Sequence, residues 1–544
     1  MPRIDFKGKT FVQNHHLAVP FHQLIPDAKK SSTGTPSLTD NLVVQGDNLL
    51  ALKALLPTYA GKVKCVYIDP PYNTGNEHWV YSDNVNNPMI REWLGKIVGR
   101  EGEDLTRHDK WLCMMMPRLK LLRELLSEDG VIVINIENNE YANLKLLVDE
   151  IFGLSNFVGT YIWRKKEGGG QAKEAFITEH EYVLIYQKSS KFQWFDEVVE
   201  SGDSSFNKED DRGRYKAVKL AKWGNTARRE DRPKMHFPIY TPAGKKVLPI
   251  APDGTPGRWR VGKARMDALL ADDLVEFADK GGKVVAYEKI YYTEDSVDTI
   301  KERSILYDLT NTADASKQLT EIFGKKDAFD TPKPVELVKY FLTYTTQQDS
   351  LVLDSFAGSG TTAQAVLELN KEDGGNRRFI LVEMEDYADN ITAERVRRVI
   401  KGGPESKNEL LKKGLGGTFS FFNLGPAIET ESLLNGKNLP SYEELARYVF
   451  YTATGEDFEP SKIDEAKHFI GKSSQYDVYM LYKPDLEYLK STALTLDEAR
   501  SLHAQASGRH LLIFAPTKYV EQTELDNLGI SFCQLPFEIY KLKA

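Results

Sequence analysis

The sequence predicts an α/β protein built around a largely parallel sheet, and three observations lead to that prediction. Short apolar runs of strand length alternate with stretches in which apolar residues recur every three or four positions. The apolar runs are continuous, as in strands that are buried on both faces of a parallel sheet. A glycine-rich turn, within LDSFAGSGTTAQAV (353–366), connects one of these strands to a helix. Together these features predict a sheet with helices on both faces.

The first half of this sheet is expected from residues 41–190, after an N-terminal arm (1–40) that contains a polar, exposed loop at 28–39. Five apolar runs are predicted as strands, and a long stretch with helical spacing is predicted to end before Gly130, a common helix stop. The strands are predicted at 42–47, 65–69, 131–136, 157–163 and 181–188, and the helices at 48–60 and 111–129.

The composition changes after residue 190. Residues 191–325 are charged, irregular and rich in Gly and Pro, which predicts an inserted domain. The alternating pattern resumes in 326–424, and residues 425–544 form a further α/β domain in which we find no catalytic motif. In these last two parts, helices are predicted at 335–346 and 361–370, and strands at 351–356, 378–384, 476–483 and 510–516.

Length and composition narrow the class of protein. The 544 residues predict two to four domains, at about 100–200 residues per domain. No apolar run approaches the ~18 residues of a membrane span, and the N-terminus lacks the apolar segment of a signal peptide, so the expected location is the cytoplasm. Cys65, Cys113 and Cys533 lie far apart, so neither a metal site nor a disulfide framework is expected. The net charge of −8 does not exclude nucleic acid as a partner, because phosphate binding depends on local patches.

The glycine-rich turn is a candidate ligand site. Gly358 and Gly360 allow a sharp turn and close approach of the backbone to a ligand, and the helix behind them presents free N–H groups. No Lys follows as in GxxxxGK[ST], which disfavours a nucleoside triphosphatase. Glu383 ends the next predicted strand, where an acidic side chain commonly binds ribose hydroxyls. The combination predicts a site for an adenosine-containing cofactor, whereas the turn alone could equally be a tight connection without a ligand.

A second motif, Asp69-Pro70-Pro71-Tyr72, directly follows a predicted buried strand. The two prolines fix the backbone and remove two N–H donors, so the carbonyls of Asp69 and Pro70 are expected to be rigid acceptors beside the Asp69 carboxylate. Acceptors on both hydrogens of a planar NH₂ group favour its nucleophilic form and stabilise the positive charge that develops on nitrogen. Tyr72 offers a ring on which a base taken out of a duplex can stack. The alternative is a proline-rich turn without a chemical role.

Six segments, in a fixed order, resemble the motifs of β-class DNA adenine-6-amino methyltransferases. The DPPYNTG extension and the C-terminal domain resemble the modification subunits of type III restriction systems. The likeness is strong over about 40–190 and 325–425, looser over 425–544 and weakest in 190–325. The matching segments are VQGDNLLALKAL (44–55), CVYIDPPYNTG (65–75), MPRLKLLRELLSEDGVIVINI (116–136), EHEYVLIYQK (179–188), FDTPKPVELVKYFL (329–342) and LDSFAGSGTTAQAVLELN (353–370).

The resemblance implies a Rossmann-like, S-adenosylmethionine-dependent methyltransferase fold in a circularly permuted order, because the catalytic tetrapeptide precedes the cofactor loop. Residues 191–325 then correspond to a target-recognition domain, between catalytic (41–190) and cofactor-binding (326–424) halves. By the same resemblance Asp47 contacts the adenine ring, and the segment Thr331-Pro332-Lys333-Pro334 binds the carboxylate end of the cofactor, although Lys333 could also be a surface lysine. The methionine part is expected to contact Asp354, Phe356, Ala357, Gly358, Ser359, Gly360 and Thr361, and the ribose Glu383.

The sequence departs from this pattern in three places. Ser355 stands where the family often has Pro, a change expected to have little effect. Residues 86–110 lengthen the loop after DPPYNTG, which leaves the rim of the base pocket less defined. The chain has no helicase motifs, so DNA cleavage would require a separate restriction subunit.

Residues 212–234 carry nine basic and two acidic side chains, with Tyr215 and Trp223 among them. A basic stretch with aromatics in an acidic chain predicts contacts with phosphates and bases, and the alternative is a solvated loop. The glycine-rich loop at 165–176 could close over the site or be a simple linker, whereas Trp163 and His180 are expected to pack. The predicted DNA-binding residues are Arg212, Arg214, Lys222, Arg228, Arg229 and Arg232.

The sequence thus predicts a site-specific methyltransferase that flips an adenine out of duplex DNA and methylates its 6-amino nitrogen from S-adenosylmethionine, as the modification subunit of a type III restriction-modification system. The expected assembly is a homodimer that works with or without a separate restriction subunit. A solitary adenine methyltransferase and a cytosine-4-amino methyltransferase remain alternatives. Members of the cytosine group more often carry Ser and Trp or Phe where this chain has Asp69 and Tyr72. A non-catalytic DNA-recognition subunit is the alternative from another class, although both catalytic motifs are intact.

Overall fold

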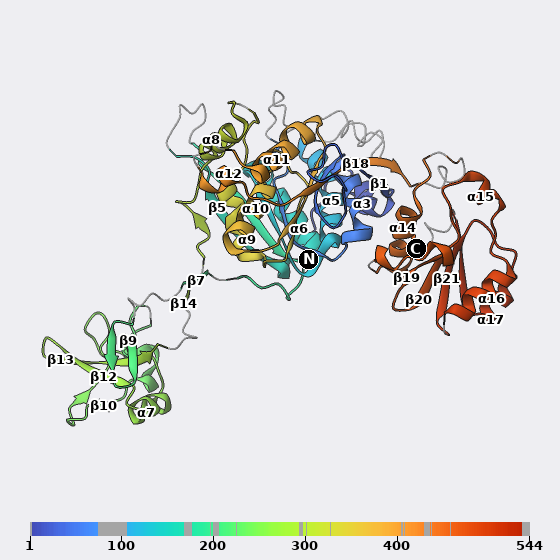
Figure 1. The fold of residues 1–544 in the computed structure, drawn as a ribbon. Helices are drawn as coiled ribbons and strands as arrows, with labels where there is room; N and C mark the ends of the chain where they lie inside the picture. The colour runs from blue at the N-terminus through green and yellow to red at the C-terminus, as the bar shows by residue number, and fades with distance from the viewer. Residues whose placement is uncertain are drawn as a thin grey trace. The chain divides into compact units, whose positions relative to one another are not determined.

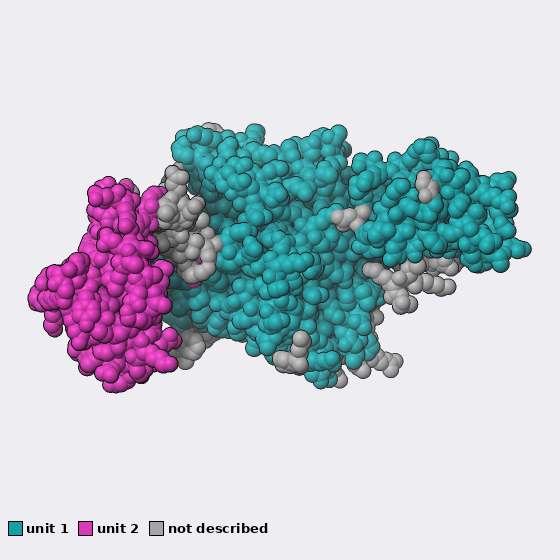
Figure 2. Space-filling view, turned by 90° about the horizontal axis from the view of Figure 1, so that it is seen from below, with its two compact units in different colours: residues 1–195, 303–544 teal, residues 196–302 magenta. Residues whose placement is uncertain are grey.

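The computed structural model resolves two compact units, which are described separately: residues 1–195 with 303–544, and residues 196–302 (Figure 2). No helix in the described part of the chain is long and apolar enough to cross a membrane. The structure describes residues 3–73, 106–167, 177–195, 197–199, 206–224, 226–292, 298–300, 302–326, 328–403, 406, 408–428, 436, 438–456, 458–506 and 508–535.

The first unit contains a ten-stranded mixed sheet in the order β1-β18-β2-β17-β16-β3-β4-β6-β5-β15. Figure 1 shows β5 and the pair of β1 and β18 on opposite sides of this unit. The six strands from β18 to β4 run parallel to one another, whereas β6 is antiparallel to both of its neighbours and β1 is antiparallel to β18. The α/β class is therefore confirmed, but the expectation of a parallel sheet holds only for its centre. The strands are β1 (His22–Pro26), β2 (Asn41–Gln45), β3 (Val63–Ile68), β4 (Leu126–Ile136), β5 (Phe157–Arg164), β6 (His180–Gln187), β15 (Ile305–Leu306), β16 (Leu351–Asp354), β17 (Arg378–Glu383) and β18 (Phe419–Ala427).

Helices cover both faces of this sheet, because consecutive strand residues point to opposite sides. Val43 packs in one hydrophobic core and Val44 in the other, and all of the strand residues of β3 are buried. The helices α3, α5 and α6 contribute to the core around Val44, and α9, α10 and α11 to the core around Val43. Their bounds are α3 (Asn48–Tyr59), α5 (Arg107–Leu125), α6 (Asn138–Phe152), α9 (Val335–Thr345), α10 (Thr361–Asp373) and α11 (Glu394–Lys401).

The predicted helix at 111–129 is wrong at its C-terminal end. Helix α5 ends at Leu125, and the chain becomes extended at Leu126, which pairs with Val63 of β3. The apolar spacing continues through Leu125 and Leu126, so periodicity alone did not reveal this change from helix to strand.

The centre of the sheet contains a topological switch point. Strands β3 and β16 are parallel neighbours, with Val352 opposite Cys65. From β3 the chain continues through α5 to β4 on one side, and from β16 it continues through α10 to β17 on the other side. Ligands of open α/β sheets bind outside the carboxyl ends of the strands at such a point. The fold therefore places the ends of β3 and β16 at the position where a site is expected.

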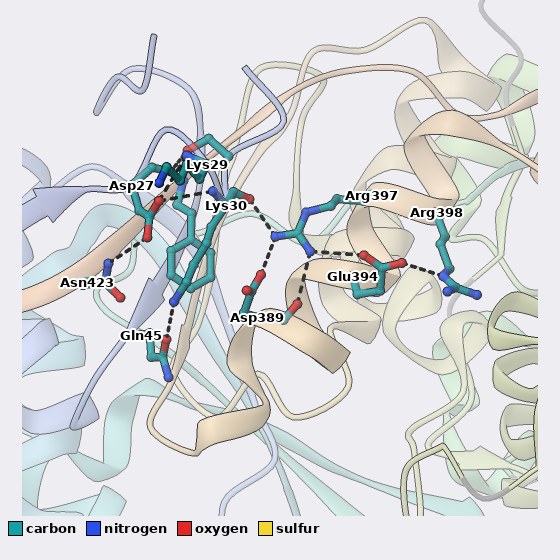
Figure 3. A network of polar contacts seen from close by, with 11 residues as sticks. Asp27, Lys29, Lys30, Gln45, Asp389, Glu394, Arg397, Arg398 and Asn423 are labelled. Carbon is teal, nitrogen blue, oxygen red and sulfur yellow. Dashed lines mark hydrogen bonds and ion pairs between the residues drawn. The ribbon is translucent and has the colours of Figure 1, made fainter. Parts of the chain in front are cut away.

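The N-terminal segment covers β18, the last strand of the parallel part of the sheet. Strand β1 pairs with β18, and the N–H groups of Asp27 and Ser32 donate to the carbonyls of Phe421 and Phe419. Figure 3 shows Arg397 at the centre of the contacts that hold this segment, with Nη2 2.7 Å from the Lys30 carbonyl. The predicted loop at 28–39 is thus fixed to the sheet, although many of its side chains are exposed.

The remaining N-terminal and C-terminal elements also belong to the first unit. The residues after β18 form α14 and a four-stranded sheet in the order β19-β20-β21-β22, in which β20, β21 and β22 are parallel. Tyr448 and Phe450 of α14 pack in the same core as Val44 of β2 and Leu52 of α3. The elements are α1 (Lys9–Val12), α2 (His15–Ala18), α12 (Glu409–Lys413), α14 (Tyr442–Thr454), β19 (Phe469–Lys472), β20 (Tyr476–Met480), α15 (Leu486–Ser491), α16 (Leu496–Gln505), β21 (His510–Ala515), α17 (Gln522–Asn527) and β22 (Ile530–Gln534).

The second unit has its own sheet, in the order β12-β13-β9-β8, and its own core around Trp259 and Met266. It is shorter at its C-terminal end than the predicted insert of 191–325. Ile305 in β15 pairs with β5, and α8 (Thr312–Phe323) contacts α11, so residues 303–325 belong to the first unit. The elements are β7 (Glu197–Val199), β8 (Lys208–Asp210), β9 (Gly213–Lys219), β10 (Ile239–Tyr240), β11 (Lys246–Val247), α7 (Lys263–Ala271), β12 (Val275–Lys280), β13 (Lys283–Tyr291) and β14 (Asp298–Ile300).

Candidate active site

A cavity of about 400 Å³ lies at the switch point, between the residues that follow β3 and those that follow β16. It brings together the two motifs that stand far apart in the sequence, and it adds the segment before α9. Many of the predicted site residues line this cavity, namely Asp69, Pro70, Pro71, Tyr72, Lys333, Asp354, Phe356, Ala357, Gly358, Ser359 and Thr361.

A smaller cavity of about 50 Å³ adjoins the first, since Pro71 and Phe356 line both. Glu383 lines the smaller cavity, and the ribose contact predicted for it stays a prediction. The hydroxyl of Ser355 also lies there, buried and without a hydrogen-bond partner among the described residues. Lys333 thus lines the larger cavity, Glu383 lines the smaller one, and the ring of Phe356 lies between them. This arrangement suits an elongated ligand such as S-adenosylmethionine.

The backbone of the Asp69–Tyr72 tetrapeptide is held by its neighbours. The indole N–H of Trp111 in α5 donates to the Pro71 carbonyl at 2.7 Å, and the Trp111 side chain is fully buried. Asn73, directly after Tyr72, has φ 57°, and Thr331, directly before Pro332, has φ 45°. Non-glycine residues with positive φ are uncommon and persist where the surrounding structure enforces them. Two of them therefore flank the cavity, one on each of the segments that approach it.

Each oxygen of the Asp69 carboxylate has a donor in the described structure. Its Oδ1 accepts a hydrogen bond from the Tyr72 hydroxyl at 2.6 Å, and its Oδ2 lies 2.8 Å from Nζ of Lys333. Burial raises the pKa of Asp69, Glu181 adds to this effect, and Lys333 opposes it. Lys333 also lies 4.9 Å from the centre of the Tyr72 ring. The alternative of a surface lysine is therefore wrong, because the Lys333 side chain is only 11% exposed and lies inside the site.

Glu181, at the start of β6, is a site residue that the sequence did not indicate. Its Oε2 lies 2.9 Å from the Tyr72 hydroxyl and 3.5 Å from Nζ of Lys333, and its Oε1 lies 3.1 Å from Nζ of Lys165. Burial alone would raise the pKa of Glu181, but the two lysines outweigh it and hold the pKa below its ordinary value. Lys165 also contacts Glu137, and both of these side chains line the larger cavity. The only sequence signal for Glu181 was an acidic residue at the start of a buried strand in EHEYVLIYQK.

The glycine loop is organised by two buried carboxyl groups. Asp354 accepts from the Phe356 N–H at 3.0 Å and from the Thr362 hydroxyl at 2.6 Å. Glu383 accepts from the N–H groups of Gly358 at 2.7 Å, Met384 at 2.9 Å and Glu385 at 3.1 Å. Burial raises the pKa of each carboxyl to about 7. Both groups therefore shape the loop as well as line the cavities.

Gly358 and Gly360 have φ values of 51° and 79°, in the left-handed region that favours glycine. A Cβ on Gly360 would lie 3.0 Å from the Thr392 carbonyl oxygen. Gly360 does not line either described cavity, so its role is in the turn. The buried Arg395 supports the glycine loop, because its Nη1 donates to the Ser359 hydroxyl at 2.9 Å. Arg395 lies outside the motifs, in α11, and no local pattern marked it.

Asp47 lies beside the smaller cavity and is not among its described lining residues. Its carboxylate caps α3 by accepting from the Leu49 N–H at 2.8 Å, and it lies 3.5 Å from Nη2 of Arg118. The neighbouring Asn48 does line the cavity, and its Nδ2 donates to the Ser355 carbonyl at 3.0 Å. The adenine contact predicted for Asp47 stays a prediction, with Asn48 as the adjacent side chain that reaches the cavity.

The predicted DNA-binding residues all lie in the second unit. Arg212, Arg214, Arg228, Arg229 and Arg232 are exposed, and Lys222 is half-buried. The side chain of Arg228 pairs with Asp253 at 2.8 Å. The two aromatics differ. Trp223 is 68% exposed, whereas Tyr215 is buried and donates to Glu276, so only Trp223 is available to a base.

Two further expectations concern neighbouring segments. Trp163 packs as expected, fully buried, with its indole N–H donating to the Thr310 carbonyl at 2.7 Å. His180 forms an edge contact with Tyr182. The loops at 165–176 and 86–110 lie mostly outside the described residues. Within the described residues, no group of three or more His, Cys, Asp or Glu could hold a metal ion.

Comparison with known proteins gives matches over most of the chain. Residues 63–394 match the DNA methylase family of N6 and N4 methyltransferases. The Mod subunit of the type III restriction-modification enzyme EcoPI from Escherichia phage P1 is 32% identical over 477 residues, which cover 79% of this chain and 73% of that protein. The StyLTI Mod subunit of Salmonella typhimurium is 31% identical, covering 72% of this chain and 59% of that protein. The type II methyltransferase M.KpnI of Klebsiella pneumoniae is 35% identical, and the match covers 63% of this chain and 81% of that protein.

Proposed function

Because the chain belongs to the N6/N4 DNA methylase family, we propose that it methylates the 6-amino nitrogen of adenine in duplex DNA, with S-adenosylmethionine as the methyl donor. The observation that carries this proposal is the shared cavity of the Asp69–Tyr72 tetrapeptide and the glycine loop. An acceptor set for an amino group and a candidate cofactor site thus lie side by side, as transfer between two bound molecules requires.

The residues around the two cavities fit this cofactor. Lys333 and the N-terminus of α10, which has no side-chain cap, supply positive charge for the carboxylate of the methionine part. Phe356 and Pro71 line the junction of the two cavities, and Glu383 supplies an acceptor for ribose hydroxyls in the smaller one. When bound, the cofactor supplies a methyl group on a sulfonium, which is already a good leaving group. The protein is therefore required mainly to position the amine and to stabilise charge.

Asp69 is the residue that we assign to the target amine. Its carboxylate accepts an N–H from the amine and stabilises the positive charge that develops there, and its raised pKa makes it a better acceptor. The Pro70 carbonyl is the second acceptor, on a backbone fixed by two prolines. Tyr72 presents its ring for stacking of the flipped base. The Asp69 and Tyr72 side chains favour adenine over cytosine by the resemblance of the motif.

The second unit is assigned to DNA recognition. Fifteen basic and three acidic residues lie between Arg212 and Arg265, inside a chain with a net charge of −8. The loop that carries Arg228 and Arg229 is fixed by backbone hydrogen bonds to residues 256–258, so its arginines project from a defined scaffold. Exposed Trp223 adds a stacking surface within the same stretch. Phosphate contacts from such a surface supply affinity, and base contacts supply sequence specificity.

The similarity to two type III Mod subunits supports a role as the modification subunit of a type III system. In that role the chain works in a defence system together with a separate restriction subunit, and forms a homodimer. A solitary adenine methyltransferase remains the second candidate, because the similarity extends to M.KpnI, which is described as a type II methyltransferase and not as a Mod subunit. Co-purification with a candidate helicase–nuclease subunit separates the two.

The test is methyl transfer from labelled S-adenosylmethionine to unmethylated genomic DNA, followed by digestion to nucleosides. The proposal expects the label in N6-methyl-2′-deoxyadenosine. Label in N4-methyl-2′-deoxycytidine would favour the cytosine alternative and contradict the assignment of the base. DNA binding without any transfer would indicate the non-catalytic recognition subunit.

A further inference from the structure

The ligand-free arrangement of Asp69 raises a problem for the proposed reaction. Both oxygens of its carboxylate are already engaged, by the Tyr72 hydroxyl at 2.6 Å and by Lys333 at 2.8 Å. Each oxygen can accept a second hydrogen bond, but a lysine that stays on Asp69 keeps its positive charge beside an amine that is itself becoming positive. If a donor simply left Asp69, a buried hydroxyl or ammonium would lose its partner, which is unfavourable in a desolvated site.

Glu181 offers the same two donors a second acceptor. Its Oε2 lies 2.9 Å from the Tyr72 hydroxyl and 3.5 Å from Nζ of Lys333, so each donor can change acceptor with a small movement. The Glu181 side chain is only 5% exposed, and no movement of the backbone is required. Its other oxygen, Oε1, lies 3.1 Å from Lys165, which anchors the carboxylate in this position.

We propose that Glu181 is a positioning residue that receives the Tyr72 hydroxyl and Lys333 when the target amine binds Asp69. This inference rests on the proposed function and extends it to a residue outside the catalytic tetrapeptide. Glu181 frees Asp69 for the amine while the Tyr72 ring keeps its hydrogen bond and therefore its orientation. The transfer is an exchange of hydrogen-bond acceptors, and no covalent bond to Glu181 forms or breaks.

The charges around the two carboxylates support this division of labour. Lys165 and Lys333 hold the pKa of Glu181 below its ordinary value, so it stays ionised and can accept both donors. Burial raises the pKa of Asp69, which makes it the better acceptor for an amine that acquires positive charge. Glu137 completes the set by pairing with Lys165, and it contacts neither Tyr72 nor Lys333 in the described structure.

The test compares Glu181→Gln with a matched control, Asp149→Asn. Asp149 is a buried carboxylate outside the site with the same kind of partners: it accepts from the Tyr186 hydroxyl at 2.7 Å and pairs with Lys145 at 2.7 Å. Both substitutions replace a buried carboxylate by an amide of similar shape. Steady-state kinetics on unmethylated genomic DNA, and thermal unfolding of each variant, separate an effect on the reaction from an effect on stability.

We expect Glu181→Gln to lower kcat by about 10²-fold, within the range of a positioned polar group in catalysis, at a Tm similar to that of Asp149→Asn. In a Tyr72→Phe background, the factor by which Glu181→Gln lowers kcat is expected to be at least about fivefold smaller than in the wild-type background. The reason is that the Tyr72 hydroxyl is then absent, so Glu181 has only Lys333 to receive. Glu181→Asp should recover part of the activity, since it restores the charge.

Two results would overturn this inference while leaving the proposed function intact. One is a wild-type chain that methylates DNA while Glu181→Gln loses no more activity than Asp149→Asn. The other is an equal loss in the Tyr72 and Tyr72→Phe backgrounds, which would assign Glu181 a purely structural role. A wild-type chain without any transfer would instead overturn the proposed function, and the role of Glu181 with it.

Discussion

Lys333 and Asp69 form an ion pair, with 2.8 Å between Nζ and Oδ2, although they come from opposite halves of the sequence. Lys333 precedes α9, which leads to β16, and Asp69 directly follows β3. The pair can form only because β3 and β16 are parallel neighbours whose carboxyl ends meet. This ion pair joins the predicted catalytic motif to the predicted cofactor segment, and the following predictions depend on that junction.

Replacing Asp69 by Ala should separate catalysis from cofactor binding. The substitution removes the acceptor for the reacting amine and leaves the glycine loop intact, so methyl transfer should fall by about 10²–10⁴-fold. The affinity for S-adenosylmethionine, measured by calorimetry, should change far less. Asp129→Ala is the control, because it removes a carboxylate that pairs with Lys64 outside the cavity. Near-normal turnover of Asp69→Ala would exclude the tetrapeptide from the active site.

The glycine loop should determine cofactor affinity. Gly358 has φ 51°, so Gly358→Val introduces a branched side chain into a conformation that valine rarely adopts. Glu383→Ala removes the acceptor of three backbone N–H groups and leaves them unpaired. Calorimetry should show weaker S-adenosylmethionine binding for both variants, with the larger loss for Gly358→Val. Unchanged affinity in both variants would place the cofactor elsewhere.

Neutralising Arg228, Arg229 and Arg232 together should weaken DNA binding and reduce its dependence on salt. All three are exposed, so the fold should tolerate alanine at each position. The log–log salt slope should fall by about one unit for each phosphate that the variant no longer neutralises, while cofactor binding stays intact. A triple alanine variant at Lys462, Lys467 and Lys490 removes the same charge from exposed positions of the C-terminal domain and serves as the control. If the arginine variant keeps the affinity and slope of the parent, the basic stretch is a solvated loop.

The raised pKa values of Asp354 and Glu383 predict a dependence of stability on pH. Burial raises both to about 7, so the folded chain keeps these protons at pH values where the unfolded chain has released them. Their contribution to stability is therefore fully present below about pH 4, and it is lost as the pH rises to about 7. Thermal unfolding at a series of pH values should show a smaller decline in Tm over this range for Glu383→Gln than for the wild type. Identical declines in the two proteins would contradict the assignment to Glu383.

The sequence was sufficient to predict the central strands and both motifs, because each is a local pattern. A short apolar run predicts strand β3, and the residues next to it predict the Asp69 turn. Strand β16 and its glycine loop are predicted in the same way. Glu181 could not be predicted in this way. Its place beside Tyr72 depends on β6 lying antiparallel to β4 in the sheet. Which distant segments pair in a sheet is not encoded in the spacing of residues along one segment. Tyr215 shows the same limit, since its burial depends on the pairing of β9 with β13.

The central claim is that this chain methylates the 6-amino group of adenine at a defined DNA sequence. Methylation-sensitive long-read sequencing of DNA from cells that express the chain tests it most directly, because one measurement reports the base, the site and the strand. The parallel culture expresses Asp69→Ala. The account predicts N6-methyladenine within one short recurring sequence, present with the wild-type chain and absent with Asp69→Ala. Methylation at cytosine, or the same adenine signal with both chains, would contradict it.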